Sequence, residues 1–428
     1  MTNPNGSWPL TPLHKVTTKI GSGLTPLGGR ESYKHEGIAL IRSQNVYDFH
    51  FEDDGLAFID DEQAKKLANV QVEPGDILLN ITGASVARCC MVPQRLLPAR
   101  VNQHVAIVRA APNLAVPGFV FYCINSPRYK HHLLTLAQGG ATREALTKET
   151  IENFEVPLPP LPTQVRIASV LSAYDDLIEN NTRRIAILEE MARSLYREWF
   201  VNFRFPGHDD VKMVDSSFGP VPSGWSVMNL SQLVTTQYGY TESASTDAVG
   251  PKFLRGMDIN KNTYIDWDAV PYCPIDDKER DRYRLSKGDI VVIRMADPGK
   301  VGIVEQDVDA VFASYLIRLA VTSPFVRPYY LFHFLVSERY QDYVTGASTG
   351  TTRKSASAGV MTAIDLPLPP DPLLRRFEEL VTDLRMSLNA LLAKNSVLRG
   401  TRDLLLPRLI SGELDVSDLD IDTGGLSA

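Results

Sequence analysis

The chain has 428 residues, of which 44% are hydrophobic and 22% charged, and these ordinary values exclude a fibrous repeat or a wholly disordered chain. The 44 basic and 51 acidic residues give a net charge of −7, whereas a nucleic-acid-binding protein usually carries a basic domain. Four cysteines are too few for a disulfide framework, and no apolar run approaches the roughly 20 residues of a membrane span. We therefore expect a globular, cytosolic protein of two or three domains.

The first 160 residues combine short strand patterns with helical ones. Runs at Asp76–Asn80 and Val105–Arg109, bounded by Gly, Pro and Asn, predict β-strands. Aromatic and aliphatic residues at spacings of three and four predict a helix over Phe119–Leu136. A Gly-rich loop at Gly139–Arg143 and a Pro-rich turn at Val156–Pro160 come next, before a long helical pattern. This order predicts an α+β domain followed by a long helix.

The second part of the chain repeats the same order. Strand patterns at Asp289–Arg294 and Leu316–Ala320 precede a helical pattern at Tyr329–Thr345. A second polar loop, Gly350–Arg353, and a second Pro-rich turn, Leu366–Pro370, each lie 210 residues after their counterparts. Two matches at one offset are improbable by chance, so we predict a tandem duplication of about 210 residues.

After each Pro-rich turn, apolar residues recur at alternating spacings of four and three. A 3.5-residue period held this long predicts two helices, each about 50–60 Å long, that pair along a supercoiled seam. Packing of each helix on its own domain is the alternative. The predicted seam positions are Ile167, Leu171, Tyr174, Ile178, Asn181, Ile185, Leu188, Ala192, Leu195 and Trp199 in the first helix and Phe377, Val381, Leu384, Leu388, Leu391, Asn395, Leu398, Arg402, Leu405 and Leu409 in the second.

An antiparallel pairing of these helices makes a specific prediction. If Ile167 faces Leu409, then Asn181 faces Asn395, and the two amides can satisfy each other and fix the register. For the helix starts, Asp371 before Pro372 is a candidate N-cap, and Thr163 is the corresponding residue in the first copy.

The sequence lacks the motifs of a catalytic site. Gly23 and Gly28 have the glycine spacing of a phosphate-binding loop, but Gly29-Arg30 follows where Lys-Ser/Thr is needed. Asp276-Asp277-Lys278 resembles the pattern of metal-dependent nucleases, yet it lies in a charge-rich stretch where a solvated turn is the simpler interpretation. The Asn/Asp-Pro-Pro-aromatic motif of amino-methyl transfer is absent as well. We therefore expect a binding protein with no catalytic residues and no metal site.

Two similar domains joined by paired helices suit a bipartite DNA site, since such sites are read as spaced half-sites. Arg and Lys can reach guanine or phosphate, and Asn and Gln can bond adenine, so polar residues at corresponding places in the copies are candidate DNA contacts. For any single residue, a capping, turn or surface role is the alternative. The candidates are Arg42, Gln44, Asn45, Thr82, Ser85, Arg88, Asn102, Gln103, His104, Thr142 and Arg143 in the first copy and Arg255, Asp258, Arg294, Lys300, Ser314, Tyr315, Arg353 and Lys354 in the second.

Several segments resemble the specificity subunits of type I restriction-modification systems. The first long helix, Leu158–Phe200, and the end of the second, Arg402–Leu414, are similar to the two helical conserved regions of that family. The Gly-Asp-Ile segments and the start of the second copy, Gly219–Trp225, are similar to its target recognition domains. The sequence departs from the family pattern in having Thr163 before Gln164 where an acidic residue is common, and the second copy lacks this Gln.

The resemblance implies a fold and a set of partners. The fold is α+β, with two homologous α/β target recognition domains separated by two long helices that form an antiparallel, pseudo-twofold symmetric coiled coil. The chain would be a non-catalytic specificity subunit that binds double-stranded DNA, with each domain recognising half of a split, asymmetric sequence. It would assemble with two methyltransferase and two restriction subunits, which supply the S-adenosylmethionine, ATP and Mg²⁺ chemistry, and would hold no cofactor itself.

We predict five segments from these patterns. They are a first recognition domain (1–155), a central Pro-rich turn and helix (156–205), a second recognition domain (206–365), a C-terminal Pro-rich turn and helix (366–412) and an acidic tail expected to be disordered (413–428). A duplicated coiled-coil scaffold whose domains bind proteins is the alternative function.

The net charge is unevenly distributed along these segments. The tail carries −5 of the −7, residues 1–160 are neutral, and residues 211–370 carry −2. A nearly neutral body with local basic loops is compatible with a DNA-binding subunit that borrows phosphate-binding surface from its partners.

Overall fold

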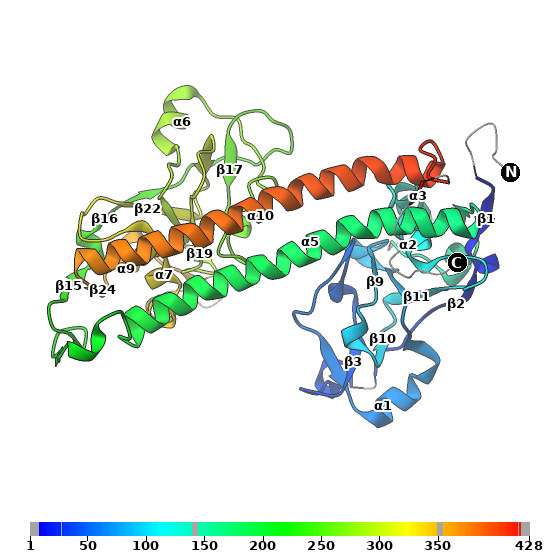
Figure 1. Ribbon diagram of the computed structural model, residues 1–428, viewed down its shortest axis with the longest axis horizontal. Coiled ribbons are helices and arrows are strands. Elements are labelled where there is room, and N and C mark those ends of the chain that lie inside the picture. The colour runs from blue at the N-terminus through cyan, green and yellow to red at the C-terminus, as the bar shows by residue number, and fades with distance from the viewer. Residues whose placement is uncertain (1–7, 27, 139–143, 349–353, 418, 421–428) are drawn as a thin grey trace. The chain divides into compact units, whose positions relative to one another are not determined.

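The structure, a computed structural model, describes residues 8–26, 28–138, 144–348, 354–417 and 419–420 (Figure 1). It divides into two compact units: unit 1 comprises residues 1–180 and 397–428, and unit 2 comprises residues 181–396. Each unit contains one α+β head, which we call head 1 (residues 10–157) or head 2 (residues 213–368), together with a part of each long helix. Three candidate residues, Thr142, Arg143 and Arg353, lie outside the described residues.

Head 1 is built around two four-stranded sheets, with strand orders β6-β3-β10-β7 and β2-β11-β8-β9. All neighbours in these sheets are antiparallel except β3 and β10, which are parallel. The elements in chain order are β1 Leu10–Pro12, β2 Thr17–Ser22, β3 Ile38–Ile41, β4 Val46–Tyr47, β5 His50–Phe51, β6 Ala57–Ile59, α1 Asp61–Lys66, β7 Gln71–Val72, β8 Ile77–Asn80, β9 Cys89–Met91, β10 Ala99–Val101, β11 Val105–Ala110, α2 Pro117–Asn125, α3 Pro127–Gln138, α4 Lys148–Glu152 and β12 Glu155–Pro157, followed by the long helix α5 Leu161–Tyr196.

Head 2 has the same plan with one smaller sheet. The sheet β16-β22-β18-β20 is antiparallel and matches the second sheet of head 1, while β17 and β21 form a parallel pair. The elements are β13 Met213–Val214, β14 Val221–Pro222, β15 Ser226–Asn229, β16 Val234–Tyr238, β17 Lys252–Leu254, α6 Asp277–Tyr283, β18 Ile290–Ile293, β19 Met295–Ala296, β20 Val301–Ile303, β21 Ala310–Phe312, β22 Leu316–Val321, α7 Pro328–Val336, α8 Glu338–Ala347, β23 Lys354–Ser355, α9 Ala358–Thr362 and β24 Asp365–Leu368, followed by the long helix α10 Asp371–Ser411.

The central strand of each head is buried on both faces. In β8, Ile77 and Leu79 join the cluster that contains α2, whereas Leu78 joins the cluster between the two sheets. In β18, Val292 and Val291 divide in the same way between the two cores of head 2. Successive side chains of a strand point to opposite faces, so a strand covered on both sides is apolar without a break. The predicted strands at β8, β11, β18 and β22 are thus confirmed.

Each predicted helix after the sheets is in fact a pair of helices. The break between α2 and α3 lies at Ser126 (ψ 143°), because the following Pro127 pushes its predecessor into the extended region. The break between α7 and α8 lies at Ser337 (ψ 152°), although Glu338 rather than proline follows. The prediction of single helices over Phe119–Leu136 and Tyr329–Thr345 was therefore wrong.

Neither long helix begins where its predicted cap would place it. The helix α5 starts at Leu161, and the carbonyl of Pro160 accepts hydrogen bonds from the amides of Thr163 (2.9 Å) and Gln164 (3.0 Å). Thr163 is therefore not the N-cap; it lies in the first turn, where a preceding proline costs no hydrogen bond. The helix α10 starts at Asp371 itself, whose carboxylate bonds Arg327 (2.7 Å) and Arg375, so its predicted capping role was wrong by one residue.

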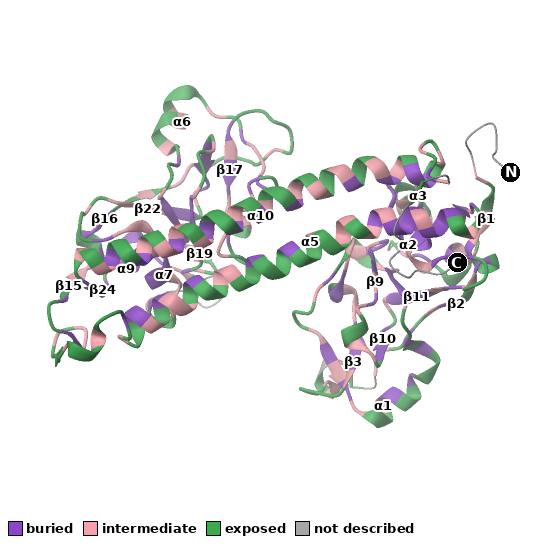
Figure 2. Cartoon of the chain, in the orientation of Figure 1, coloured by how far each residue is buried: buried purple, intermediate pink, exposed green. Residues whose placement is uncertain are grey.

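The residues of the predicted seam are all buried or half-buried along both helices. In unit 2, Nδ2 of Asn181 donates to Oδ1 of Asn395 at 2.8 Å, as the antiparallel register requires. Next to this pair, Ile185, Leu388 and Leu391 form a small apolar cluster between the helices. The alternative interpretation is also partly right, because the outer turns of both helices pack into the heads (Figure 2).

Each head therefore contains apolar residues from both long helices. In unit 1 the core of head 1 includes Ile167 and Leu171 of α5 and also Leu406, Leu409 and Ile410 of α10. In unit 2 the core of head 2 combines the first turns of α10 with the end of α5, which continues into a π-helical turn at Arg197–Val201. A segment that follows head 2 in the sequence thus completes the core of head 1.

Part of the predicted acidic tail packs against the core of unit 1. Val416 is buried there, and the partly buried Leu414 contacts the same cluster. The guanidinium of Arg408 donates to Glu413 at 2.8 Å. Residue 418 and residues 421–428 lie outside the described part of the chain. Among the described residues, none of the helices has the length and apolar character needed to cross a bilayer.

Candidate nucleic-acid interface

The candidate residues of head 1 gather where four strands begin or end. The parallel strands β3 and β10 end side by side, since Val101 pairs with Ile41 and the amide of Asn102 donates to the Ile41 carbonyl at 3.0 Å. The next residue after β3 is Arg42. The antiparallel strands β8 and β11 meet at the same edge, where the Ile81 amide donates to the His104 carbonyl at 3.0 Å. This geometry brings three separate candidate segments of head 1 to one sheet edge.

Arg42 and Gln44 are held above this edge by a shared backbone carbonyl. The guanidinium of Arg42 donates to the carbonyl of Gly55 and lies over the ring of Tyr33, 5.1 Å from its centroid. Nε2 of Gln44 donates to the same carbonyl at 3.1 Å. The Nε atom of Arg42 is buried without a partner in the described structure. Stacking on an aromatic face restricts the guanidinium while leaving its remaining donors available.

A second polar group surrounds His104. Its ring Nδ1 lies 2.7 Å from Oγ1 of Thr82, and its backbone amide donates to Oδ1 of the buried Asn102 at 3.0 Å. The exposed Gln103 accepts from the hydroxyl of Thr25, and its Nε2 lies 3.3 Å from the imidazole Nε2. Asn102 and Thr82 therefore orient the histidine, while Gln103 and His104 present polar atoms to solvent.

Other candidates of head 1 have different surroundings. Asn45 is fully buried; its Oδ1 accepts from the Arg42 amide (3.1 Å), and its Nδ2 donates to the Glu52 carbonyl (2.9 Å). These bonds shape the turn that follows β3 and leave Asn45 inaccessible to a ligand. Ser85 is half-buried in the turn Gly83–Ser85, and Arg88 lies over the ring of Tyr47 at 4.7 Å.

Head 2 repeats this backbone frame with different side chains. The Ala313 amide donates to the Leu254 carbonyl and the Arg294 amide to the Tyr315 carbonyl, both at 2.9 Å, matching the two bonds of head 1. Arg255 follows β17 as Arg42 follows β3, but its guanidinium is paired with Asp258 at 2.8 Å. Asp258 also accepts from the Arg255 amide at 2.8 Å, so it shapes the turn as Asn45 does in head 1.

The most accessible candidates of head 2 lie around Arg294. Its guanidinium lies over the ring of Tyr238, 4.9 Å from the centroid, and its buried Nε has no partner in the described structure. Tyr315 and Lys354 are exposed, and Lys354 pairs with Ala296 between β23 and β19, two residues beyond Arg294. Lys300 is exposed, and its carbonyl accepts from the Ile293 amide at 2.8 Å, next to Arg294; Ser314 is half-buried.

Three tyrosines that support arginines were missed in the sequence. Tyr33, Tyr47 and Tyr238 each carry an arginine guanidinium on their ring. Tyr33 lies nine residues before Arg42, whereas Tyr47 and Tyr238 lie 41 and 56 residues before Arg88 and Arg294, so no common spacing relates each tyrosine to its arginine.

The acidic segment of head 2 has a structural explanation. Asp276 is the N-cap of α6, because its Oδ1 accepts from the Glu279 amide at 3.0 Å. The predicted solvated turn is therefore the start of a short helix. Within the described part of the chain, no three His, Cys, Asp or Glu side chains lie close enough to hold a metal ion.

The chain is similar to proteins of one known family. Residues 19–190 match the family model described as type I restriction modification DNA specificity domain. The MjaIX specificity subunit of Methanocaldococcus jannaschii is 25% identical over 418 residues, covering 94% of this chain and 92% of the relative. The EcoKI specificity subunit of Escherichia coli is 22% identical over 392 residues, covering 88% and 82%.

The fold is shared with a solved structure. The type I restriction-modification S subunit from M. genitalium aligns with a TM-score of 0.54 and 14% identity, covering 96% of this chain and 97% of that chain. This similarity confirms the expected α+β class with long helices. The curated relatives that match this chain over most of its length are themselves named type I restriction enzyme specificity subunits, so the chain is similar to that family over nearly its whole length.

Proposed function

We propose that this chain is the non-catalytic, sequence-specific DNA-binding subunit of a type I restriction-modification complex, in which each head recognises one half of a bipartite, asymmetric site. The observation that carries the proposal is the repeated sheet edge. Two heads with the same backbone bonds present His104 with Gln103 in one case and Tyr315 with Ser314 in the other. A common frame with different polar side chains is what recognition of two different half-sites requires.

The same sheet edge also has features suited to binding a polyanion. Arg42, Arg88 and Arg294 lie over tyrosine rings, which limits their conformational freedom before any ligand arrives. The fork of an arginine matches both guanine and phosphate. Arg255, in contrast, is neutralised by Asp258, so we assign it a structural role and leave Arg294 as the principal cation of head 2.

We further propose that the long helices dock two methyltransferase subunits and, through them, two restriction subunits. Apolar side chains outside the seam support this assignment, since they are at least half exposed on helices whose other face is already covered. They are Leu177, Ile187 and Met191 on α5 and Met386, Val397 and Leu404 on α10. The partner subunits would supply the S-adenosylmethionine, ATP and Mg²⁺ chemistry, in the cytoplasm where the DNA substrate lies.

Reconstitution with the methyltransferase subunit tests the proposal. Affinity for duplex DNA should fall with salt, with a log–log slope of about −0.9 per neutralised phosphate, and mapping of methylated adenines should give one split motif. Arg42→Ala should relax one half of that motif and Arg294→Ala the other half, while the exposed Lys66→Ala control leaves both unchanged. Absence of both a salt slope and a sequence preference would favour the protein-binding scaffold instead.

A further inference from the structure

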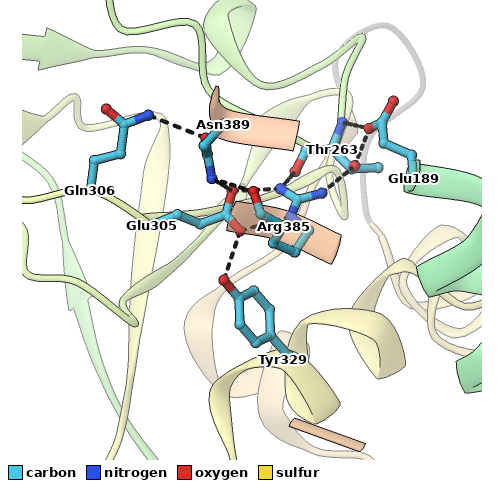
Figure 3. Close-up of polar contacts among 7 residues, drawn as sticks. All are labelled: Glu189, Thr263, Glu305, Gln306, Tyr329, Arg385 and Asn389. Atoms are coloured by element: carbon cyan, nitrogen blue, oxygen red, sulfur yellow. Dashed lines mark hydrogen bonds and ion pairs between the residues drawn. The ribbon is translucent and has the colours of Figure 1, made fainter. Parts of the chain in front are cut away.

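A buried ion pair joins head 2 to the long helix α10 within unit 2. Nε and Nη2 of Arg385 donate to the two carboxylate oxygens of Glu305, both at 2.7 Å. The side chains are only 1% and 5% exposed, and the guanidinium also lies 5.6 Å from the ring centroid of Phe332. Figure 3 shows this pair at the centre of a larger group of polar side chains. The side chain of Arg385 thus projects from α10 into head 2, which provides its ion-pair partner and the aromatic ring beside it.

The surrounding bonds extend the pair to α5. Arg385 donates to the hydroxyl (3.1 Å) and the carbonyl (2.9 Å) of Thr263, and Glu189 of α5 accepts from the hydroxyl and the amide (3.3 Å) of the same threonine (Figure 3). Tyr329 donates to Glu305 at 2.9 Å, and Asn389 donates to it at 3.3 Å. One connected network therefore holds both long helices and three segments of head 2.

The energetics of such a pair favour a geometric role. Removing two charges from water costs nearly as much as their attraction returns, so an apolar pair of similar volume is often as stable. A bidentate arginine–carboxylate pair differs from an apolar contact in its narrow range of allowed angles. A buried, fully bonded Arg385–Glu305 pair therefore restricts the orientation of head 2 on its helices more than it adds to stability.

The equivalent position in unit 1 carries the opposite charge. Asp175 lies 210 residues before Arg385 and likewise faces its head, accepting from the hydroxyl of Tyr122 at 2.7 Å. The guanidinium of Arg402, from α10, donates to Asp175 at 2.5 Å. The duplicated frame has thus kept a charge that faces the head but not its sign or its partners, which indicates a contact specific to each head.

We propose that Arg385 is a positioning residue for DNA recognition: by fixing the orientation of head 2 on α5 and α10, it restricts the number of base pairs that the subunit accepts between the two half-sites. This inference rests on the proposed function, because it concerns the gap in a bipartite site. Arg385 itself is buried and touches no DNA; it acts through Glu305 and Thr263.

Methylation mapping tests this inference without knowing the recognised sequence beforehand. The subunit and its methyltransferase are expressed in a host without adenine methylation at the site, and the gap between methylated half-motifs is counted across the genome. Arg385→Met should leave both half-motifs unchanged but raise methylation of sites with a gap one base pair longer or shorter at least tenfold. Arg385→Lys should give a smaller increase, and the exposed Arg399→Met control on α10 none.

The double variant Arg385→Met with Glu305→Gln guards against misfolding, because it leaves no unpaired buried charge. A gap profile identical to that of the wild type in this variant overturns the inference. Equal loss of methylation at every gap also overturns it, because that is the result of a merely structural role. A wild-type subunit that yields no split motif refutes the proposed function itself, so the two failures are distinguishable.

Discussion

The Asn181–Asn395 pair allows a direct test of the helix register. The two side chains are 8% and 1% exposed and share a hydrogen bond of 2.8 Å in unit 2. Asn395→Leu removes the acceptor of the Asn181 amide, and an unsatisfied buried donor costs about 1–3 kcal/mol. Because 1 kcal/mol corresponds to a change in Tm of about 2–4 °C in domains of 150–250 residues, we expect a loss of about 2–12 °C for unit 2.

Replacing both asparagines with leucine should recover most of this loss. Two apolar residues of similar shape leave no polar group of the pair unsatisfied. The double variant should therefore be more stable, by about 1 kcal/mol or more, than the sum of the two single-variant losses predicts. The assay is a double-mutant cycle by thermal and urea unfolding. Three of the four tryptophans, Trp199, Trp225 and Trp267, lie in unit 2, so their fluorescence reports on this unit.

A matched control for this cycle is available one residue earlier on the same helix. Lys394 is exposed, and Lys394→Leu should change the free energy of unfolding by no more than about 0.5 kcal/mol. If the losses of the two single asparagine variants simply add in the double variant, the amides do not interact and the proposed register is refuted.

Two further predictions concern the cores of the units. Leu409 lies after head 2 in the sequence, yet Leu409→Ala should destabilise unit 1 by about 2–5 kcal/mol. Hydrogen exchange should become faster in β8 and β11 and stay unchanged in β18 and β22. Slower or equal exchange in head 1 would contradict this. Burial, together with the charges of Arg385 and Arg193, lowers the pKa of His333 to about 3. The unfolded chain binds this proton below about pH 6.5 and the native chain does not, so acid should destabilise unit 2 by up to about 1.4 kcal/mol per pH unit between pH 6.5 and 3. His333→Phe should lose this dependence, measured as the difference in unfolding free energy from the wild type, and an unchanged slope would exclude His333 as its source.

The long-range pattern of the helices was predictable because it depends on periodicity. A 3.5-residue repeat specifies which residues face the partner helix, and the two polar interruptions, Asn181 and Asn395, then determine one antiparallel register. The central strands were predictable for a similar reason, since unbroken apolar runs such as Ile290–Ile293 indicate burial on both faces.

The ends of the helices and the hydrogen-bond partners of individual side chains were harder to predict from the sequence. No proline follows Ser337 to indicate the break between α7 and α8. The start of α5 before Thr163 depends on the carbonyl of Pro160, which accepts hydrogen bonds from two backbone amides. The roles of Asn45 and Asp258 were assigned to DNA, but both side chains bond the backbone of a preceding arginine. A polar residue type does not reveal whether its partner is the protein itself or a ligand, because that depends on the fold.

The shared core of unit 1 has a consequence for protein synthesis. Head 1 is translated first, yet Leu406, Leu409 and Ile410 of its core emerge from the ribosome only after all of head 2. At about 5–20 residues per second, the roughly 250 residues between head 1 and this segment take on the order of 10–50 s to translate. During that interval head 1 exposes the apolar surface that α10 later covers. Ribosomes that stop early therefore release chains whose first head is incomplete, because the core of head 1 is completed only when synthesis continues through the end of α10.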